Sequence, residues 1–209
     1  MTIKLIALVI FSYLLGSFPS AYIAGKIRKG IDIRRVGSRN AGATNVLMVI
    51  GPIFAALVYV IDLLKGLIPV LLAKNIIGTD ISMGLCGLAA ILGHDFPIFI
   101  KFSGGKGVAT TTGAMFGINA TIMTILFFAW IFFVALTNYF ILSSLICMAL
   151  IPILMYLFKL SDTFMIFGIL IFLAGLFTHR ADVVRISRGQ HPKAFDSIRK
   201  YFGRPTNLV

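Results

Sequence analysis

Long apolar stretches, separated by short polar turns, dominate the chain. A helix needs about 20 mostly apolar residues to cross the roughly 30 Å of hydrocarbon in a bilayer. Stretches of that length run over residues 3–24, 46–73 and 81–99, and the 51 residues of 108–158 contain no formally charged side chain. A shorter apolar run at 164–178 comes before the basic C-terminal tail. The pattern predicts an all-α integral membrane protein that forms a polytopic helical bundle.

The uncharged block 108–158 is too long for a single crossing. Its polar or flexible interruptions lie at 117–121 and at Thr137-Asn138. Four short crossings fit between Lys106 and the basic tail, over residues 107–119, 121–136, 138–158 and 162–178. The total is then about seven crossings. The first two are shorter than a full span, so a total of five is an alternative, with 108–136 as one long tilted helix.

The net charge of +12 is concentrated in three segments. Residues 25–40 carry six Lys or Arg against Asp32, Lys101 and Lys106 add two positive charges, and residues 179–209 carry seven Lys or Arg against two Asp. Basic loops stay in the cytoplasm by the positive-inside rule. We therefore expect an N-terminus outside, a cytoplasmic C-terminus, and cytoplasmic segments at 25–45, 100–107 and 179–209.

Composition excludes several function classes. With 59% apolar and 12% charged residues, the chain is not a water-soluble globule. All seven acidic residues are Asp, which leaves few ligands for a Ca²⁺ loop or a carboxylate-bridged metal centre. Cys86 and Cys147 have no partners at zinc spacing, so we expect neither a metal nor a cofactor. The basic segments alternate with apolar spans and lack interleaved aromatic residues, so we expect no nucleic-acid partner.

A pair of ionisable residues lies inside the second apolar stretch. Asp62 and Lys65 are three positions apart and share a helix face. Charged groups within a span are expensive unless they meet each other or a polar cavity. The spacing therefore predicts one of these two arrangements.

The first of three polar stretches with candidate chemistry runs over residues 37–46. Small residues let backbone N–H groups approach an oxyanion, and a helix start adds unsatisfied donors and the positive end of its dipole. An ordinary turn followed by a helix N-cap would produce the same pattern, and both interpretations stay open. As an anion site, the stretch offers Ser38, Arg39, Asn40, Gly42, Thr44 and Asn45.

The second polar stretch joins residues 93–97 to residues 101–110. Gly104, Gly105 and Gly107 surround Lys106 just before a predicted helix, which makes a backbone nest with a cation at its edge, suited to phosphate. It is not a Walker A loop, because Gly107 stands where that loop needs a Ser or Thr for Mg²⁺. We expect no nucleotide hydrolysis. An alternative role for the lysine is a cytoplasmic membrane anchor, but the three glycines favour anion binding.

The third polar stretch, residues 178–191, follows the last apolar run. His179 and Asp182 are within reach of each other if the helix continues for one more turn. An imidazole at the membrane interface can donate to phosphate or act as a base near neutral pH. A single interfacial His is more often a polar anchor, so this stretch by itself leaves both roles open.

Together with residues 62–66, these stretches resemble, in content and order, the bacterial membrane family of acyl-phosphate:glycerol-3-phosphate acyltransferases. The likeness covers essentially all of 1–209, as one transmembrane acyltransferase domain. It implies transfer of a fatty acyl group from acyl phosphate to the C1 hydroxyl of glycerol 3-phosphate, giving 1-acyl-glycerol 3-phosphate and phosphate in phospholipid synthesis. It also implies a multi-pass protein of the bacterial cytoplasmic membrane, in contact with membrane lipids. A candidate partner is the soluble enzyme that makes acyl phosphate.

The resemblance also implies roles for individual residues. Ser38, Lys106 and His179 would be the catalytic residues, the first two holding the phosphate of the acceptor with help from the third. The backbone over 40–45 and 104–107 would hold the acyl phosphate. No side chain would act as a dedicated base, and the phosphate itself would take the proton. The remaining substrate-binding positions are Asp182 and Arg185.

Three positions depart from the pattern of this family. Met48 stands where the family usually has Arg, Asp182 where it has Asn, and His191 where it has Glu. The first two weaken the expected hold on glycerol 3-phosphate, by about 1.5 to 3 kcal/mol for a lost charge-assisted hydrogen bond. Arg39, where the family often has Gly, is a candidate replacement cation. Alternatives are a divergent paralogue that uses acyl phosphate with another small acceptor, or a non-enzymatic membrane transporter or scaffold.

Overall fold

The computed structural model of the chain describes residues 2–191 and 193–196. Residues 2–191 form nine α-helices and two short 3₁₀ helices, and no strand occurs among the described residues. The all-α prediction is confirmed. In chain order the elements are α1 (Thr2–Gly16), α2 (Ser20–Lys29), η1 (Ile33–Arg35), α3 (Ala43–Val49), α4 (Pro52–Ile76), α5 (Asp80–Asp95), η2 (Ile98–Ile100), α6 (Val108–Ile118), α7 (Ala120–Thr137), α8 (Phe140–Leu157) and α9 (Asp162–Ser187).

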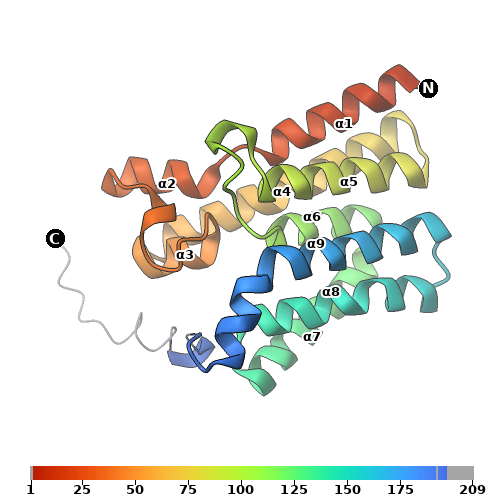
Figure 1. Cartoon of the computed structure of the whole chain (residues 1–209). Coiled ribbons are helices and arrows are strands. Elements are labelled where there is room, and N and C mark those ends of the chain that lie inside the picture. The colour runs from red at the N-terminus through yellow and green to blue at the C-terminus, as the bar shows by residue number, and fades with distance from the viewer. Residues whose placement is uncertain (1, 192, 197–209) are drawn as a thin grey trace.

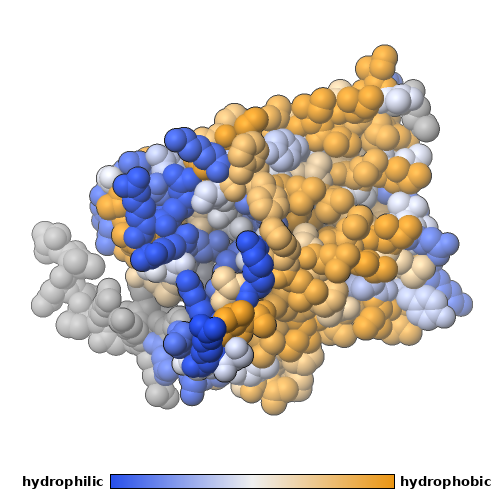
Figure 2. Space-filling model, viewed as in Figure 1, coloured by the Kyte–Doolittle hydropathy of each residue, from blue (hydrophilic) through white to orange (hydrophobic). Residues whose placement is uncertain are grey.

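Within the described part of the chain, six helical stretches are long and apolar enough to cross a membrane. They are Thr2–Lys29, Pro52–Ile76, Asp80–Ile100, Ala120–Thr137, Phe140–Leu157 and Asp162–Ser187. Large apolar side chains cover much of the outside of the bundle, and Figure 2 shows them as a band with polar residues gathered at the end that carries α2 and α3. A surface of this kind is stable in lipid rather than in water. The chain is a multi-pass membrane protein.

The spanning helices run back and forth between the two ends of the bundle (Figure 1). α1 packs on α4 and α5, α6 packs on α4, α5 and α7, and α8 packs on α7 and α9. As a result α2, α3 and the end of α9 gather at one end, and the N-terminus lies at the other. The arrangement brings the predicted polar stretches to the same end of the bundle.

Two predicted spans are interrupted in the structure. The predicted span 3–24 lies within the candidate span Thr2–Lys29, but two helices form it rather than one. α1 ends before Pro19, which has no N–H to continue it, and α2 begins after it. The predicted span 46–73 is divided in the same way. There α3 ends just before Gly51, whose φ of 137° is accessible to glycine but not to other residues, and α4 begins with Pro52.

Asn119 separates α6 from α7. Its backbone is extended, with φ −152°, and its Oδ1 accepts a hydrogen bond from the N–H of Ile122 at 3.0 Å, which caps α7. The alternative of one long helix over 108–136 is therefore wrong. α6 has 11 residues, about 16 Å of helix and roughly half of the hydrocarbon thickness. A total of seven crossings stays a prediction.

Glycine residues allow α4 and α6 to touch through their backbones. A Cβ at Gly66 would overlap the carbonyl oxygen of Thr110, and a Cβ at Gly113 would overlap the carbonyl oxygen of Leu63. Small residues at such contacts are typical of helix packing in membranes. This contact holds the first turn of α6, and the loop before it, close to α4.

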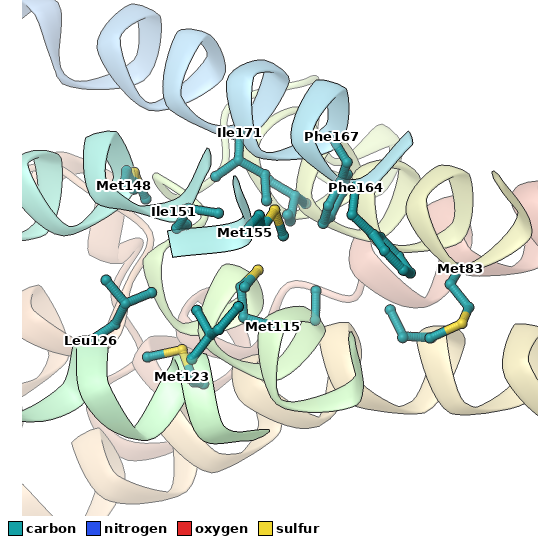
Figure 3. Close-up of a cluster of buried hydrophobic side chains, with 14 of the residues drawn as sticks. Met83, Met115, Met123, Leu126, Met148, Ile151, Met155, Phe164, Phe167 and Ile171 are labelled. Atoms are coloured by element: carbon teal, nitrogen blue, oxygen red, sulfur yellow. The ribbon is translucent and has the colours of Figure 1, made fainter. Parts of the chain in front are cut away.

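A methionine-rich core lies among α5, α6, α7, α8 and α9 (Figure 3). Methionine is flexible and fills irregular gaps between helices. The core holds α6 and α9 in fixed relative positions, and both helices carry residues of the polar end. Its buried side chains include Met83, Met115, Met123, Met148, Met155, Phe164, Phe167 and Ile171.

Candidate active site

Asn45 organises the loop that contains Ser38. Its side chain is fully buried. Its Nδ2 donates to the carbonyl oxygens of Ile33, Val36 and Asn40 at 2.9, 3.1 and 3.0 Å, and its Oδ1 accepts from the N–H of Ser38 at 2.9 Å. One amide group thus folds the loop around itself. The side chain is engaged in these hydrogen bonds, so its predicted contribution to substrate binding stays a prediction.

The other candidates of this loop differ in their exposure. Ser38, Arg39 and Thr44 are exposed, Asn40 is half-buried, and Gly42 is the buried N-cap of α3. Arg39 has a φ of 62°, in the left-handed region that costs a residue with a Cβ about 1 to 2 kcal/mol. That conformation suits the glycine that the resembled family often has there. Ser38 and Arg39 are accessible to a ligand from the aqueous side.

Gly104 and Gly105 pack their backbones against the end of α5. The N–H of Gly104 donates to the carbonyl oxygen of Asp95 at 3.2 Å, and the N–H of Gly105 donates to that of His94 at 3.0 Å. A Cβ at Gly104 would overlap the backbone of His94, and a Cβ at Gly105 would overlap its imidazole ring. These two amides are therefore engaged by α5, so the contact of the two glycines with substrate stays a prediction. Glycine is required here because the loop and α5 approach so closely.

Lys106 connects this loop to α9. Gly107, with φ 68°, is the N-cap of α6. The side chain of Lys106 reaches the carboxylate of Asp182 and forms an ion pair with it. The lysine side chain is 19% exposed and the aspartate side chain 8%, so the pair is partly shielded from water. The second and third polar stretches therefore meet in this ion pair.

His179 lies one turn before Asp182 on α9 and is almost fully buried. Its Nδ1 lies 2.9 Å from the carbonyl oxygen of Gly175. Because a carbonyl oxygen only accepts, Nδ1 carries a hydrogen, and Nε2 is the nitrogen able to accept a proton or bind a ligand. Asp182 bonds to Lys106 rather than to His179, yet both charges are near enough to act electrostatically on the imidazole ring.

One hydrogen bond joins the first polar stretch to the second, and another joins the segments next to them. The N–H of Ala41 donates to the carbonyl oxygen of Gly104 at 3.4 Å, and Nη1 of Arg34 donates to the carbonyl oxygen of Ile100 at 2.7 Å. The Arg34 guanidinium also donates to Asp32, and this hydrogen bond holds the pKa of the Asp32 carboxyl below its ordinary value. All three polar stretches are thus connected at one end of the bundle. Arg34 gave no signal in the sequence, because it is one of many basic residues there.

A buried polar cluster packs against the loop that contains Gly105. Oδ1 of Asp62 accepts from Oγ of Ser20 and from Nζ of Lys65, both at 2.5 Å, and lies 3.7 Å from Nδ1 of His94. The predicted meeting of Asp62 and Lys65 is confirmed. Ser20 and His94 come from other helices, so no spacing along the chain could have found them. A cavity of about 10 Å³, room for about one water molecule, is lined in part by Ser20, Ala41, Lys65, His94, Gly104 and Gly105.

Arg185 and the tail complete the set of predicted positions. Arg185 is exposed on the last turn of α9, and within the described residues its side chain makes no hydrogen bond or ion pair, so its role stays a prediction. Nε2 of His191 lies 3.9 Å from Oδ1 of Asp182, and its ring stands edge-on to Tyr139. Met48 is half-buried in α3. The predicted tail at position 192 and over 197–209 lies outside the described residues.

These features define a class of protein. The chain is a polytopic helical membrane protein that places a lysine, a buried histidine and two glycine-containing loops at one end of its apolar band. Within the described residues, no group of His, Cys and Asp side chains could hold a metal ion. A cationic side chain beside loops of small residues suits a small anionic substrate.

Comparison with known proteins identifies the family. The family described as glycerol-3-phosphate acyltransferase matches residues 6–189. The glycerol-3-phosphate acyltransferase of Thermotoga petrophila is 41% identical over 184 residues, which cover 88% of this chain and 93% of that protein. That of Francisella tularensis subsp. holarctica is 38% identical over 196 residues, which cover 92% of this chain and 94% of that protein. This chain belongs to the glycerol-3-phosphate acyltransferase family.

Solved structures agree with this assignment. The crystal structure of PlsY (YgiH), an integral membrane glycerol 3-phosphate acyltransferase, in its glycerol 3-phosphate form matches with a TM-score of 0.88 and 34% identity, over 91% of this chain and 95% of that chain. Its lysophosphatidic acid form matches with a TM-score of 0.86 and 32% identity, over 93% and 98%. The fold and the family therefore agree along nearly the full length of both chains.

Proposed function

We propose that this protein transfers a fatty acyl group from acyl phosphate to the C1 hydroxyl of glycerol 3-phosphate. The observation that carries the proposal is the position of Lys106, whose contact with Asp182 joins the glycine-containing loop to α9. Support comes from relatives that are glycerol-3-phosphate acyltransferases and from the PlsY structures in glycerol 3-phosphate and lysophosphatidic acid forms. A lysine suits the phosphate of the acceptor, and the adjacent apolar band suits the acyl chain.

The reaction needs little covalent help from the protein. The C1 oxygen of the acceptor forms a bond to the acyl carbon, and the bond from that carbon to the phosphate oxygen of the donor breaks. The proton of the hydroxyl ends on the released phosphate. Because an acyl phosphate is already activated, positioning and charge neutralisation can supply most of the rate enhancement. No side chain is required as a dedicated base.

The proposed roles of the residues follow from their positions. Lys106 and Ser38 hold the phosphate of the acceptor, and Nε2 of His179, the ring nitrogen not bonded to Gly175, assists them. The loop shaped by Asn45 and the amides that follow Gly105 hold the acyl phosphate. Met48 stands where the resembled family usually has Arg, so a positive charge is missing there. Arg39, which is exposed in the first loop, is proposed to replace part of that charge.

We further propose that the polar end faces the cytoplasm of a bacterium, with the N-terminus on the outer side and the basic tail inside. The three basic segments of the sequence support this orientation, and Figure 2 shows hydrophilic residues gathered at that end. A soluble enzyme that makes acyl phosphate could then deliver its product directly to the site.

The purified protein, assayed with palmitoyl phosphate in the presence and absence of glycerol 3-phosphate, tests this function. We expect 1-acyl-glycerol 3-phosphate and inorganic phosphate in equal amounts, only when both substrates are present. Palmitoyl-CoA should not replace the acyl phosphate. Product formed only with another alcohol would assign a different acceptor, and phosphate release with no acceptor at all would reject the transferase reaction.

A further inference from the structure

We propose that the carboxylate of Asp182 acts as an internal anion that occupies Lys106 until the phosphate of the acceptor displaces it. Asp182 is then a specificity-determining residue that weakens the binding of phosphorylated acceptors. The inference rests on the proposed function, because it concerns the lysine proposed to hold that phosphate.

The ion pair is built into the fold. Nζ of Lys106 and Oδ2 of Asp182 are in direct contact, and Oδ1 of Asp182 lies 3.9 Å from Nε2 of His191. The aspartate side chain is 8% exposed. A carboxylate buried to this extent needs a cation beside it. Lys106 is therefore the structural partner of Asp182 as well as the proposed ligand of phosphate.

A phosphate that arrives at Lys106 meets this carboxylate. The ammonium group offers three donors, but two anions beside one cation repel each other. Phosphate binding must therefore either move the carboxylate of Asp182 away from the lysine or lose part of the attraction to it. The Asn that the resembled family usually has at this position carries no charge and can donate to phosphate.

The same argument concerns selectivity between acceptors. The Lys106–Asp182 pair is neutral as a unit, whereas a lysine beside an asparagine would carry a full positive charge. Among the described residues, the titratable imidazoles of His179 and His191 also face the pair. A neutral pair distinguishes glycerol 3-phosphate from uncharged glycerol less strongly than a positive one would.

Steady-state kinetics of the Asp182→Asn variant, with palmitoyl phosphate and glycerol 3-phosphate, test the inference. We expect the KM for glycerol 3-phosphate to fall on the order of tenfold, the lower end of the range for one charge-assisted hydrogen bond. The preference for glycerol 3-phosphate over glycerol should rise by a similar factor. The control Asp162→Asn removes the same charge at the first turn of α9 and should leave both values as in the wild type. An unchanged or higher KM in Asp182→Asn would overturn the inference.

Direct binding separates this inference from the proposed function. Calorimetric titration of the purified wild-type and Asp182→Asn proteins with glycerol 3-phosphate requires no turnover. Tighter binding by Asp182→Asn supports the inference even if neither protein transfers acyl groups, and equal binding overturns it even if both do. Asp182→Ser serves the same test if the Asn variant does not fold. The gain should disappear in a Lys106→Met background, and a gain that persists there would place the effect elsewhere.

Discussion

The N–H of Ala41 and the carbonyl oxygen of Gly104 lie 3.4 Å apart, and this hydrogen bond joins two loops that are remote in sequence. The N–H of Gly104 also donates to the carbonyl oxygen of Asp95 at the end of α5. Two residues further on, Lys106 forms its ion pair with Asp182 of α9. The three polar stretches are therefore connected at one end of the bundle. The proposed site depends on the close approach of backbones at this point.

A methyl group at Gly104 or Gly105 should disrupt the site. A Cβ at Gly104 would overlap the backbone of His94, which cannot move without α5, and a Cβ at Gly105 would overlap the imidazole of His94. We expect kcat/KM to fall by about 100-fold for Gly104→Ala, because small misplacements of reacting groups have effects of that order. The control is Gly84→Ala, a substitution on α5 itself. Its new Cβ would lie 3.7 Å from Phe167, an ordinary contact. Similar activities of the two variants would contradict the close-packing argument.

Substitution of Asn45 should unfold the first loop. Asn45→Ala leaves one buried and two partly buried carbonyl groups without their donor, and we expect a loss of about 1 to 3 kcal/mol in the free energy of unfolding. Asn45→Asp should be no better, since a carboxylate cannot donate to the carbonyl oxygens of Ile33, Val36 and Asn40. Thermal unfolding in detergent measures the effect. Thr44→Ala, at the exposed neighbouring position, should leave the unfolding temperature unchanged; an equal loss in that variant would remove the special role of Asn45.

The buried pair of Asp62 and Lys65 should show strong coupling. Asp62→Asn or Lys65→Met alone leaves one buried charge without its partner, and we expect each to lower the free energy of unfolding by about 3 to 5 kcal/mol. The double variant should lose less than the sum of the two, because it removes both charges. Lys74→Met, exposed on the same helix α4, is the control. Additive losses in the double variant would show that the ion pair does not stabilise the fold.

Labelling of single cysteines should place the proposed site on the cytoplasmic side. Ser103→Cys and Ser187→Cys each place a cysteine at an exposed position of the polar end. Lys159→Cys places one at an exposed position in the turn between α8 and α9. The native Cys86 and Cys147 are buried. In intact cells, a thiol reagent that does not cross the membrane should label only the Lys159→Cys protein. Labelling of Ser103 and Ser187 variants from opposite sides would separate the two halves of the site.

The apolar pattern predicted the helices well, because long apolar runs in lipid have few alternatives to a helix. The interruption at Asn119 was visible as a polar residue in an uncharged block, and the structure shows the helix cap that it forms. The breaks at Pro19 and Gly51 carried local signals too. They were missed because apolar residues continue on both sides of each break and the hydropathy pattern runs through it.

The contacts of the polar end could be predicted only in part. Spacing along one helix led to the contact of Asp62 with Lys65, but also suggested Asp182 as a neighbour of His179, whereas Asp182 bonds to Lys106 on another element. Contacts between helices depend on their packing, which periodicity does not contain. The same reason explains why the participation of Ser20 and His94 was not foreseen.

The kinetics of Lys106→Met, compared with Lys101→Met, test the central claim most directly. Lys106 forms the ion pair with Asp182 at the proposed phosphate site, whereas Lys101 is an exposed lysine of the same basic segment. We expect Lys106→Met to lower kcat/KM for glycerol 3-phosphate by roughly 10- to 100-fold, the value of a charge-assisted contact, and Lys101→Met to keep the wild-type value. Wild-type kinetics in Lys106→Met would contradict the proposed site.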